Sequence, residues 1–248
     1  MVGMIFAAGY GTRLKPWTDS HPKALVPVDG VPALERVVDK MLALGINRIV
    51  VNTHHFAGQI SDFVVSRPWA QRVIISHEPI LLDTGGGLRK ALQFIGDEPV
   101  LIHNADIMTD LDLAGMAEAH RTSGADATLL TGIRATSRFL LFNPGGRLAG
   151  YYRTDGARIM PADIPAADRG DMTGRCFDGV HIVSPTLYGA LRDFAPDDTP
   201  FSIINFYRTV AANAAIRAYD MPAGRHWFDI GTPEKLAAAR DFLTTRHD

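Results

Sequence analysis

The chain has 248 residues, of which 46% are hydrophobic and 21% are charged, and its formal net charge at pH 7 is −2. This balance is typical of a globular protein, and the small net charge gives no indication of nucleic acid or an anionic membrane surface as a partner. Because Cys176 is the single cysteine, an intrachain disulfide is excluded. No apolar run reaches the ~18 residues of a membrane span, and the N-terminus lacks the basic segment of a signal peptide. We therefore expect a cytoplasmic protein.

The first half of the chain alternates between strand-like and helix-like patterns. Short apolar runs predict strands at Met4–Ala8, Arg48–Asn52, Val73–Ser76, Pro99–His103 and Ala127–Gly132. Apolar residues at helical spacing predict helices at Leu34–Leu42, Phe56–Val65, Gly86–Ile95 and Leu113–His120. Strands that alternate with helices form a mostly parallel sheet flanked by helices, so we expect an α/β, Rossmann-like fold.

The second half has a different pattern. Between residues 138 and 182, short strand-like runs are interrupted by turn-forming sequences at Asn143–Gly146, Thr154–Gly156 and Asp168–Asp171. This pattern predicts a small antiparallel lobe on the parallel core. Beyond it we expect two helices and one strand, at Ile203–Ala214, Pro233–Leu243 and His226–Ile230 respectively.

A glycine-rich loop, Ala7-Ala8-Gly9-Tyr10-Gly11-Thr12-Arg13, follows the first predicted strand, and Lys23 comes shortly after it. Glycines let backbone amides approach and surround an anion such as phosphate. Arg13 can bind phosphate oxygens through two N–H groups, and Lys23 adds a point charge. Leu14 stands where the dinucleotide-binding fingerprint has its third glycine, and no Walker sequence occurs. Taken alone, the loop is equally compatible with a structural turn.

The same segment carries a family resemblance. Ala7–Arg13, Pro16, Thr18 and Pro22-Lys23 resemble the signature of the sugar-1-phosphate nucleotidyltransferase superfamily. The resemblance implies that the chain joins a nucleoside triphosphate to a sugar 1-phosphate and releases pyrophosphate. It also implies that Arg13 and Lys23 are catalytic. The triphosphate would be bound by the residues of the glycine loop, namely Ala8, Gly9, Gly11 and Thr12.

Later motifs extend the resemblance over most of the chain. Asp83–Gly87 resembles the loop that lines the nucleobase and ribose pocket, which implies nucleotide contacts for Thr84, Gly85 and Gly86. Phe177–Val180 resembles the sugar-facing strand. Overall, the chain is most similar to single-domain members such as the N-acetylmuramate-, mannose- and heptose-1-phosphate nucleotidyltransferases.

This resemblance implies the nucleotide-diphospho-sugar transferase fold and gives the expected domain organisation. We expect a single domain over residues 1–248. Its nucleotide-binding core would span roughly 1–133 and its sugar-phosphate lobe roughly 134–225. The last strand and helix, at 226–248, would carry a metal ligand.

Asp106 and Asp229 are the predicted metal ligands. Each follows a hydrophobic strand, in Asn104-Ala-Asp106 and in Trp227-Phe-Asp229, and these motifs resemble the two metal-binding positions of the superfamily. Nucleotidyl transfer needs a hard divalent cation on the phosphates, so we expect Mg²⁺, with Mn²⁺ as a substitute. An aspartate at a strand end can instead be a turn or helix-capping residue.

The sugar-phosphate side departs from the superfamily pattern. Many members carry Glu-Lys-Pro there, with the lysine on the sugar phosphate, and this sequence does not occur in the chain. We expect Arg138 to replace that lysine, with Arg153 as the second choice and a solvated surface arginine as the alternative. Gly179 and Asn143 are the other residues that we assign to the sugar-phosphate side.

Three alternatives remain open from the sequence. We expect UTP as the nucleotide, because the glycines of the 83–87 loop leave room for close backbone contact with a base, but the same room would admit GTP. A cytidylyltransferase acting on choline phosphate or another alcohol phosphate is a related possibility. A catalytically inactive regulatory protein that binds nucleotide sugars is a possibility of another class.

Overall fold

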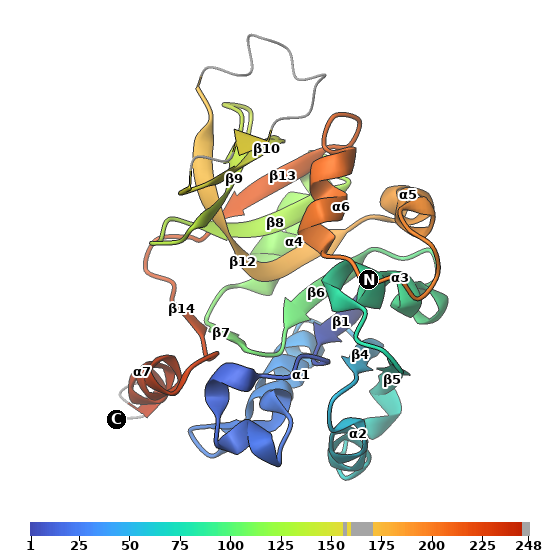
Figure 1. The fold of residues 1–248 in the computed structure, drawn as a ribbon, viewed down its shortest axis with the longest axis vertical. Helices are drawn as coiled ribbons and strands as arrows, with labels where there is room; N and C mark the ends of the chain where they lie inside the picture. The colour runs from blue at the N-terminus through green and yellow to red at the C-terminus, as the bar shows by residue number, and fades with distance from the viewer. Residues whose placement is uncertain (156–157, 160–170, 245–248) are drawn as a thin grey trace.

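The structure is a computed structural model that describes residues 1–155, 158–159 and 171–244. Figure 1 shows a central sheet with helices packed on both of its faces. Gly156 and residues 168–170, which belong to two of the predicted turns, lie outside the described residues.

Four parallel strands form the centre of the predicted core. They lie in the order β6 (Val100–Asn104), β1 (Val2–Phe6), β4 (Ile49–Thr53) and β5 (Val73–His77). Neighbouring residues of one strand face different cores, as Val50 and Val51 of β4 do. β1, β4 and β6 are buried on both faces, which is why they are visible in the sequence as short apolar runs, whereas β5 at the edge of the sheet is only partly buried.

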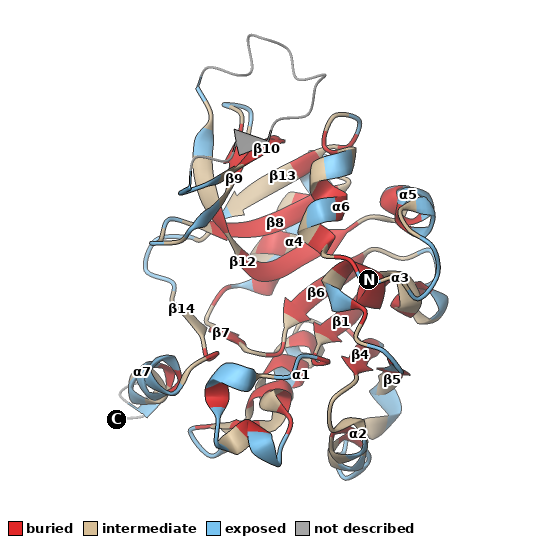
Figure 2. Ribbon diagram, in the orientation of Figure 1, coloured by how far each residue is buried: buried red, intermediate tan, exposed pale blue. Residues whose placement is uncertain are grey.

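Helices cover the two faces of this sheet. One core cluster includes buried residues of α1 (Ala33–Ala43), α2 (Ala57–Val65), α4 (Leu113–Ser123) and α7 (Pro233–Thr244). The other includes buried residues of α3 (Asp83–Ile95), α5 (Tyr188–Asp193) and α6 (Ile203–Val210). Figure 2 shows the central strands buried and the outer faces of the helices exposed. The predicted helices are therefore present, although α3 begins three residues earlier than expected, α6 ends before Ala214 and α5 was not predicted.

An antiparallel extension completes the sheet. The long strand β12 (Thr173–Val183) lies beside β6 through its second half and beside β9 (Arg138–Phe142) through its first. Beyond β9 follow β10 (Leu148–Arg153) and β11 (Arg158–Ile159), both antiparallel to their neighbours. On another edge, β8 (Ala127–Gly132) pairs with β12 and with the unpredicted β13 (Ile216–Asp220). Among the described residues, one sheet thus runs through both the predicted core and the predicted lobe.

Shorter elements lie at the ends of the sheet. A two-stranded ribbon joins β7 (Ile107–Thr109) to β14 (Trp227–Asp229), and a second joins β2 (Pro27–Val28) to β3 (Val31–Pro32). The predicted strand at His226–Ile230 is therefore present but shorter. Single turns of 3₁₀ helix occur at Thr12–Leu14, Trp17–Asp19, Lys23–Leu25, Ala70–Arg72 and Pro185–Leu187. Within the described part of the chain, no helix combines the length and the apolar character needed to cross a membrane.

Candidate active site

The glycine loop turns tightly at the end of β1 and packs against Lys23. Gly11 adopts a left-handed conformation with φ of 64° at the start of the turn Thr12–Leu14. A Cβ atom on Gly11 would lie 2.7 Å from Cβ of Lys23, so a side chain has no room there. The hydroxyl of Thr18 donates a hydrogen bond of 2.9 Å to the Gly11 carbonyl oxygen. Gly11 is thus required by both its backbone conformation and its close approach to Lys23.

A cavity of about 490 Å³ opens at the carboxyl ends of β1, β4 and β6. Ligands bind at this edge in open α/β sheets. Most of the predicted nucleotide, catalytic and metal residues line it, namely Ala8, Gly9, Gly11, Thr12, Arg13, Lys23, Thr84 and Asp106. The structure therefore brings together residues from four separate segments of the sequence.

The ribbon of β7 and β14 places the two predicted metal ligands side by side. Asp106 directly precedes β7, Asp229 ends β14, and Asp229 pairs in register with Ile107. The amide of Ile230 donates a hydrogen bond of 2.9 Å to the Asp106 carbonyl oxygen. Because this ribbon fixes both backbones, two aspartates 123 positions apart in the sequence share one end of the sheet.

Each aspartate is paired with a lysine. Lys23 forms an ion pair with Asp106, and Nζ of Lys235 lies 2.7 Å from Oδ2 of Asp229. Burial works against ionisation of Asp229, but the hydrogen bond and charge of Lys235, the charge of Lys23 and the Gly231 amide together hold its pKa below the usual value. Asp229 is therefore ionised at neutral pH and available as an anionic ligand.

The region around Gly231 connects these groups to the glycine loop. A Cβ atom on Gly231 would lie 2.6 Å from Oδ1 of Asp229, 2.8 Å from Nη2 of Arg13 and 3.3 Å from Nζ of Lys23. Two cations and a carboxylate thus converge on one glycine at the wall of the cavity. This arrangement suits a polyphosphate with a bound cation, because the site supplies both positive charge and an oxygen ligand.

The carboxylates of Asp106 and Asp229 suit Mg²⁺ better than they suit a metal ion whose whole coordination shell consists of protein ligands. Among the described residues, no group of three or more His, Cys, Asp or Glu side chains could enclose a metal ion. Mg²⁺ commonly uses one or two carboxylates and completes its shell with water and substrate phosphates. Asp106 and Asp229, next to a cavity lined for phosphate, match that requirement.

The glycines after Asp83 have a packing role. The amides of Gly85 and Gly86 donate hydrogen bonds of 2.8 and 3.2 Å to the Phe201 carbonyl oxygen, and a Cβ atom on Gly85 would lie 2.9 Å from that oxygen. Neither glycine lines the cavity, whereas Thr84 does. The geometry therefore supports the predicted nucleotide contact for Thr84 and not for Gly85 or Gly86. Because the two glycines lack a side chain, α3 can approach the segment around Phe201.

A buried polar network connects the glycine loop to the start of α3. Oδ1 of Asn52 accepts a hydrogen bond of 2.7 Å from the Ala7 amide, and its Nδ2 donates one of 2.7 Å to Oε1 of Glu78. Oε2 of Glu78 accepts a hydrogen bond of 2.9 Å from the Leu82 amide. Glu78 is fully buried, and burial raises its pKa despite these hydrogen bonds. The sequence analysis did not identify this network.

The raised pKa of Glu78 predicts a pH-dependent stability. In the unfolded chain Glu78 ionises at its ordinary pKa, whereas the folded protein resists ionisation until the pH is higher. The free energy of unfolding should therefore fall as pH rises between these two values, by about 1.4 kcal/mol for each unit of pKa difference. Chemical unfolding of wild type and Glu78→Gln at several pH values measures this contribution. A difference between the two proteins that does not change with pH would contradict it.

A second cavity, of about 660 Å³, lies next to the first. The two meet at the ribbon, because Asp229 lines the second cavity and Gly231, two residues later, lines the first. The wall of the second cavity includes several cations and aromatic rings, among them Arg134, Arg138, Tyr151, Phe177, Arg208, Trp227 and Lys235. Two adjoining cavities, with Asp106 in the wall of the first and Asp229 in the wall of the second, have the layout needed for two substrates.

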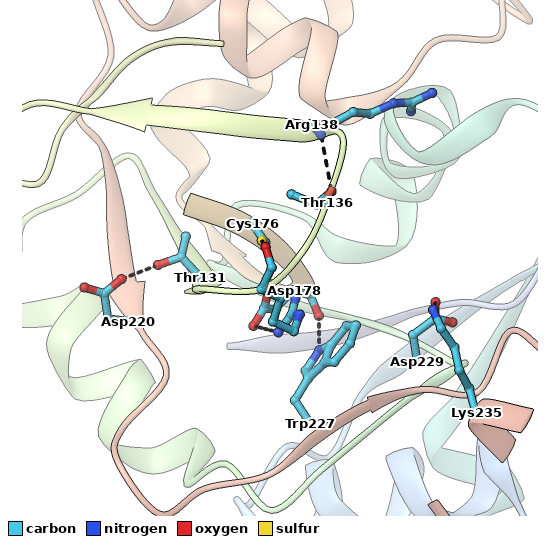
Figure 3. A network of polar contacts seen from close by, with 10 residues as sticks. Thr131, Thr136, Arg138, Cys176, Asp178, Asp220, Trp227, Asp229 and Lys235 are labelled. Carbon is cyan, nitrogen blue, oxygen red and sulfur yellow. Dashed lines mark hydrogen bonds and ion pairs between the residues drawn. The ribbon is translucent and has the colours of Figure 1, made fainter. Parts of the chain in front are cut away.

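Arg134 is held inside the wall of this cavity. It forms a two-point ion pair with Asp178, and its guanidinium carbon lies 3.6 Å above the Trp227 ring. The indole of Trp227 donates a hydrogen bond of 2.8 Å to the Asp178 carbonyl oxygen, as Figure 3 shows. Asp178 is fully buried, and although Arg134 opposes the effect, burial raises its pKa. Arg134 therefore fixes Trp227 at the cavity wall.

The predicted sugar-phosphate residues occupy different places. Arg138 is exposed at the start of β9 and lines the second cavity, with its side chain extended away from the Asp178 group in Figure 3. Arg153 is paired with Asp155 at 2.6 Å. Gly179 has φ of 75° in an irregular part of β12, where a Cβ atom would lie 2.7 Å from Nδ2 of Asn104. Of these three, Arg138 is the residue that lines the second cavity.

Asn143 lies at the turn between β9 and β10. Its Oδ1 accepts a hydrogen bond of 2.9 Å from the Arg147 amide, and its own amide donates one of 2.9 Å to the Arg147 carbonyl oxygen. Asparagine commonly stabilises turns in this way. Asn143 does not line either cavity, so the geometry supports a turn-forming role rather than the predicted sugar-phosphate role.

Comparison with known proteins identifies the family. The family model described as nucleotidyl transferase matches residues 2–139, which is more than half of the chain. The chain belongs to the nucleotidyl transferase family. The glycine loop, Lys23 and Asp106 all lie within the matched segment.

Individual relatives extend this family match over the whole chain. An N-acetylmuramate α-1-phosphate uridylyltransferase of Caulobacter vibrioides is 31% identical over 96% of this chain and 95% of its own length. A second, from Neisseria meningitidis serogroup B, is 26% identical over 97% of each chain. The crystal structure of HddC from Yersinia pseudotuberculosis complexed with GMP-PN has a TM-score of 0.73, with 23% identity over 98% of this chain and 100% of that one. The chain is thus a sugar-1-phosphate nucleotidyltransferase that forms a nucleotide sugar.

The position of Arg138 at the second cavity gives a prediction for the family reaction. Replacing Arg138 with alanine should raise KM for the sugar phosphate about 10-fold and leave KM for the nucleotide nearly unchanged, because a cation aimed at one substrate is removed. Steady-state kinetics with each substrate varied in turn measures both values. An unchanged sugar-phosphate KM, or an equal rise for both substrates, would exclude this role.

Proposed function

We propose that the chain transfers a uridylyl group from UTP to N-acetylmuramate α-1-phosphate, with Mg²⁺ as cofactor and Mn²⁺ as a substitute. The observation that carries the proposal is the pair of adjoining cavities that meet at Asp229, one lined by the glycine loop and the other by cations and aromatic rings. Two relatives that match almost the full length both of this chain and of their own bear this activity in their names, which supports the choice of both substrates.

The first cavity would hold the triphosphate. Arg13 and Lys23 lie where they can contact the phosphates, beside the backbone of Gly9 and Gly11. Positive charge there stabilises the departing pyrophosphate, and it is most effective when it is already fixed in place before the reaction. Burial of Lys23, whose side chain is 12% exposed, holds it in that position.

The reaction needs no covalent intermediate. A phosphate oxygen of the sugar phosphate attacks the α-phosphorus in line, the new P–O bond forms, and the bond to pyrophosphate breaks. Asp106 and Asp229 would hold the divalent cation, which when bound neutralises charge on the phosphates. The chain itself supplies orientation, because two cavities on either side of Asp229 keep the two substrates next to each other.

Residues near the start of α3 line part of the first cavity, and we place the base of the nucleotide there. Leu81, Asp83, Thr84 and Pro200 line this side, and Thr84 is held by a hydrogen bond of 2.9 Å from the Ile203 amide. These residues come from two segments that contact each other, so the wall is fixed. The choice of UTP rests on the names of the two N-acetylmuramate α-1-phosphate uridylyltransferases to which the chain is similar.

A panel of substrates tests the proposal. Pyrophosphate release should be fastest with UTP among the four ribonucleoside triphosphates, and N-acetylmuramate α-1-phosphate should give the highest kcat/KM among a set of sugar 1-phosphates. Glucose 1-phosphate, mannose 1-phosphate and N-acetylglucosamine 1-phosphate serve as comparisons. A higher kcat/KM with GTP than with UTP would reject the nucleotide assignment. A preference for choline phosphate with CTP would favour the cytidylyltransferase alternative.

The proposed partners are these small molecules, without nucleic acid or a membrane. We keep the cytoplasm as the proposed compartment, because nucleoside triphosphates are supplied there. An inactive regulatory role has no support from the geometry, since Arg13, Lys23, Asp106 and Asp229 are all present and converge on the two cavities.

A further inference from the structure

The cationic side chains that line the second cavity differ in the partners that they already contact. Arg134 is committed to the buried carboxylate of Asp178. Arg208 stacks on Tyr151, with 4.7 Å between its guanidinium carbon and the ring centre. Lys235 is the cation of this cavity that contacts Asp229. It therefore lies at the point where the two cavities meet, which is where the sugar phosphate has to approach the α-phosphate of the nucleotide.

The first turn of α7 explains why Lys235 lies next to Asp229. The helix begins at Pro233 after Gly231-Thr232, and the Lys235 amide is 3.4 Å from the Thr232 hydroxyl. Side chains of a helix tilt toward its N-terminus, so Lys235 points back toward Asp229 at the end of β14. Its side chain is 51% exposed, compared with 12% for Lys23. Lys235 can thus change partners without breaking a packed core, whereas Lys23 cannot.

We propose that Lys235 binds the phosphate of the sugar 1-phosphate alongside Arg138, and that Lys235 rather than Arg138 takes the place of the Glu-Lys-Pro lysine that this chain lacks. The proposal rests on the proposed function. An ammonium group has three N–H donors, so Lys235 can retain contact with Asp229 and still donate to a phosphate oxygen. When Asp229 is shared with a divalent cation, Lys235 loses part of its present ion pair, and its charge becomes available to the incoming dianion.

A cation at the position of Lys235 also offsets the electrostatic repulsion between the two substrates. The sugar phosphate carries about two negative charges and must approach a triphosphate that is already anionic, which is unfavourable unless a cation lies between them. Lys23 and Arg13 lie on the triphosphate side, in the first cavity. Lys235 lies on the acceptor side of the same carboxylate. The two lysines on the two metal-ligand aspartates would thus serve one substrate each.

Binding and kinetic measurements on Lys235→Met test the proposal. Methionine keeps the length and apolar stem of the side chain and removes the charge. We expect KM for N-acetylmuramate α-1-phosphate to rise about 10- to 100-fold with KM for UTP within about 2-fold, and Lys235→Arg to recover part of the loss. Calorimetric binding of the same sugar phosphate, to enzyme loaded with Mg²⁺ and a non-hydrolysable UTP analogue, should weaken to the same extent. Lys90→Met on α3, which lines neither cavity, is the matched control.

Each other outcome has a defined meaning. An unchanged sugar-phosphate affinity in Lys235→Met would overturn the proposal, as would equal losses for both substrates, which would indicate that Lys235 only positions Asp229. A rise in sugar-phosphate KM in Arg138→Ala but not in Lys235→Met would assign the phosphate to Arg138 instead. If wild-type enzyme uses a different sugar phosphate, the proposed acceptor is wrong and the same variants are measured with that substrate. Absence of turnover with every sugar phosphate would overturn both the proposed function and this inference.

Discussion

Replacing Asp229 with asparagine should lower kcat/KM by about 1000-fold or more, and Asp106→Asn should have an effect of the same order. Asparagine keeps the shape of the side chain but loses the anionic oxygen that a hard cation needs. A bound metal neutralises charge and so stabilises such a transition state by several kcal/mol. A loss of about 4 kcal/mol of this stabilisation corresponds to a decrease in rate of about 1000-fold. Steady-state kinetics over a range of Mg²⁺ concentrations measures the loss.

A second measurement separates metal binding from the lysine contacts. Each aspartate is also an ion-pair partner of Lys23 or Lys235, so a loss of activity alone could come from a displaced lysine. Binding of Mn²⁺, followed by electron paramagnetic resonance, should weaken in both aspartate variants. Asp197→Asn, in a fully exposed position, should behave as wild type. Full activity of Asp229→Asn, or of wild type in excess chelator, would show that the metal role is wrong.

Arg13→Ala and Lys23→Met should each lower kcat/KM at least about 100-fold. Both side chains approach Gly231 beside Asp229, so each places positive charge where we propose that the phosphates bind. Loss of a single preorganised group that stabilises developing negative charge costs about 100- to 1000-fold. The loss should appear mainly in kcat if the charge acts on the departing pyrophosphate, because the interaction is then strongest in the transition state.

The matched controls for these variants are Arg192→Ala and Lys90→Met, since neither residue lines a described cavity. Lys23 is packed under Gly11, so its variant also needs a folding test by thermal unfolding. If Arg13→Ala and Lys23→Met fold normally and retain near wild-type rates, the glycine loop does not bind the triphosphate.

The elements that the sequence predicts correctly are those whose burial pattern is local. β1, β4 and β6 are buried on both faces and therefore appear as apolar runs, and the glycine loop is contiguous with β1. In a parallel sheet, the ends of such strands meet at one edge, so the nearness of Arg13 and Asp106 follows from their positions alone.

The start of α3 shows where local reasoning fails. Asp83–Gly87 has three consecutive glycines, which disfavour a helix, yet it forms the first turn of one. The reason is the contact of Gly85 with Phe201, a residue more than 100 positions away. No periodicity in the sequence records such a contact, in which the amides of Gly85 and Gly86 donate hydrogen bonds to the Phe201 carbonyl oxygen.

Side-chain networks were missed for the same reason. The link from Asn52 to Glu78 and the group formed by Arg134, Asp178 and Trp227 each join strands that are distant in sequence. Lys235 was not predicted as a site residue, because its relation to Asp229 depends on where α7 begins. A charged residue in the first helical turn after a metal-ligand motif is the signal that could have identified it.

Label transfer from UTP tests the central claim most directly. Wild-type enzyme is incubated with Mg²⁺, N-acetylmuramate α-1-phosphate and UTP labelled either at the α- or at the γ-phosphate. Nucleotidyl transfer predicts that the α-label appears in the nucleotide sugar and the γ-label in pyrophosphate, and that both products require the sugar phosphate and the metal. Release of the γ-label as inorganic phosphate, or absence of the α-label from any sugar product with every sugar 1-phosphate tried, would contradict the account.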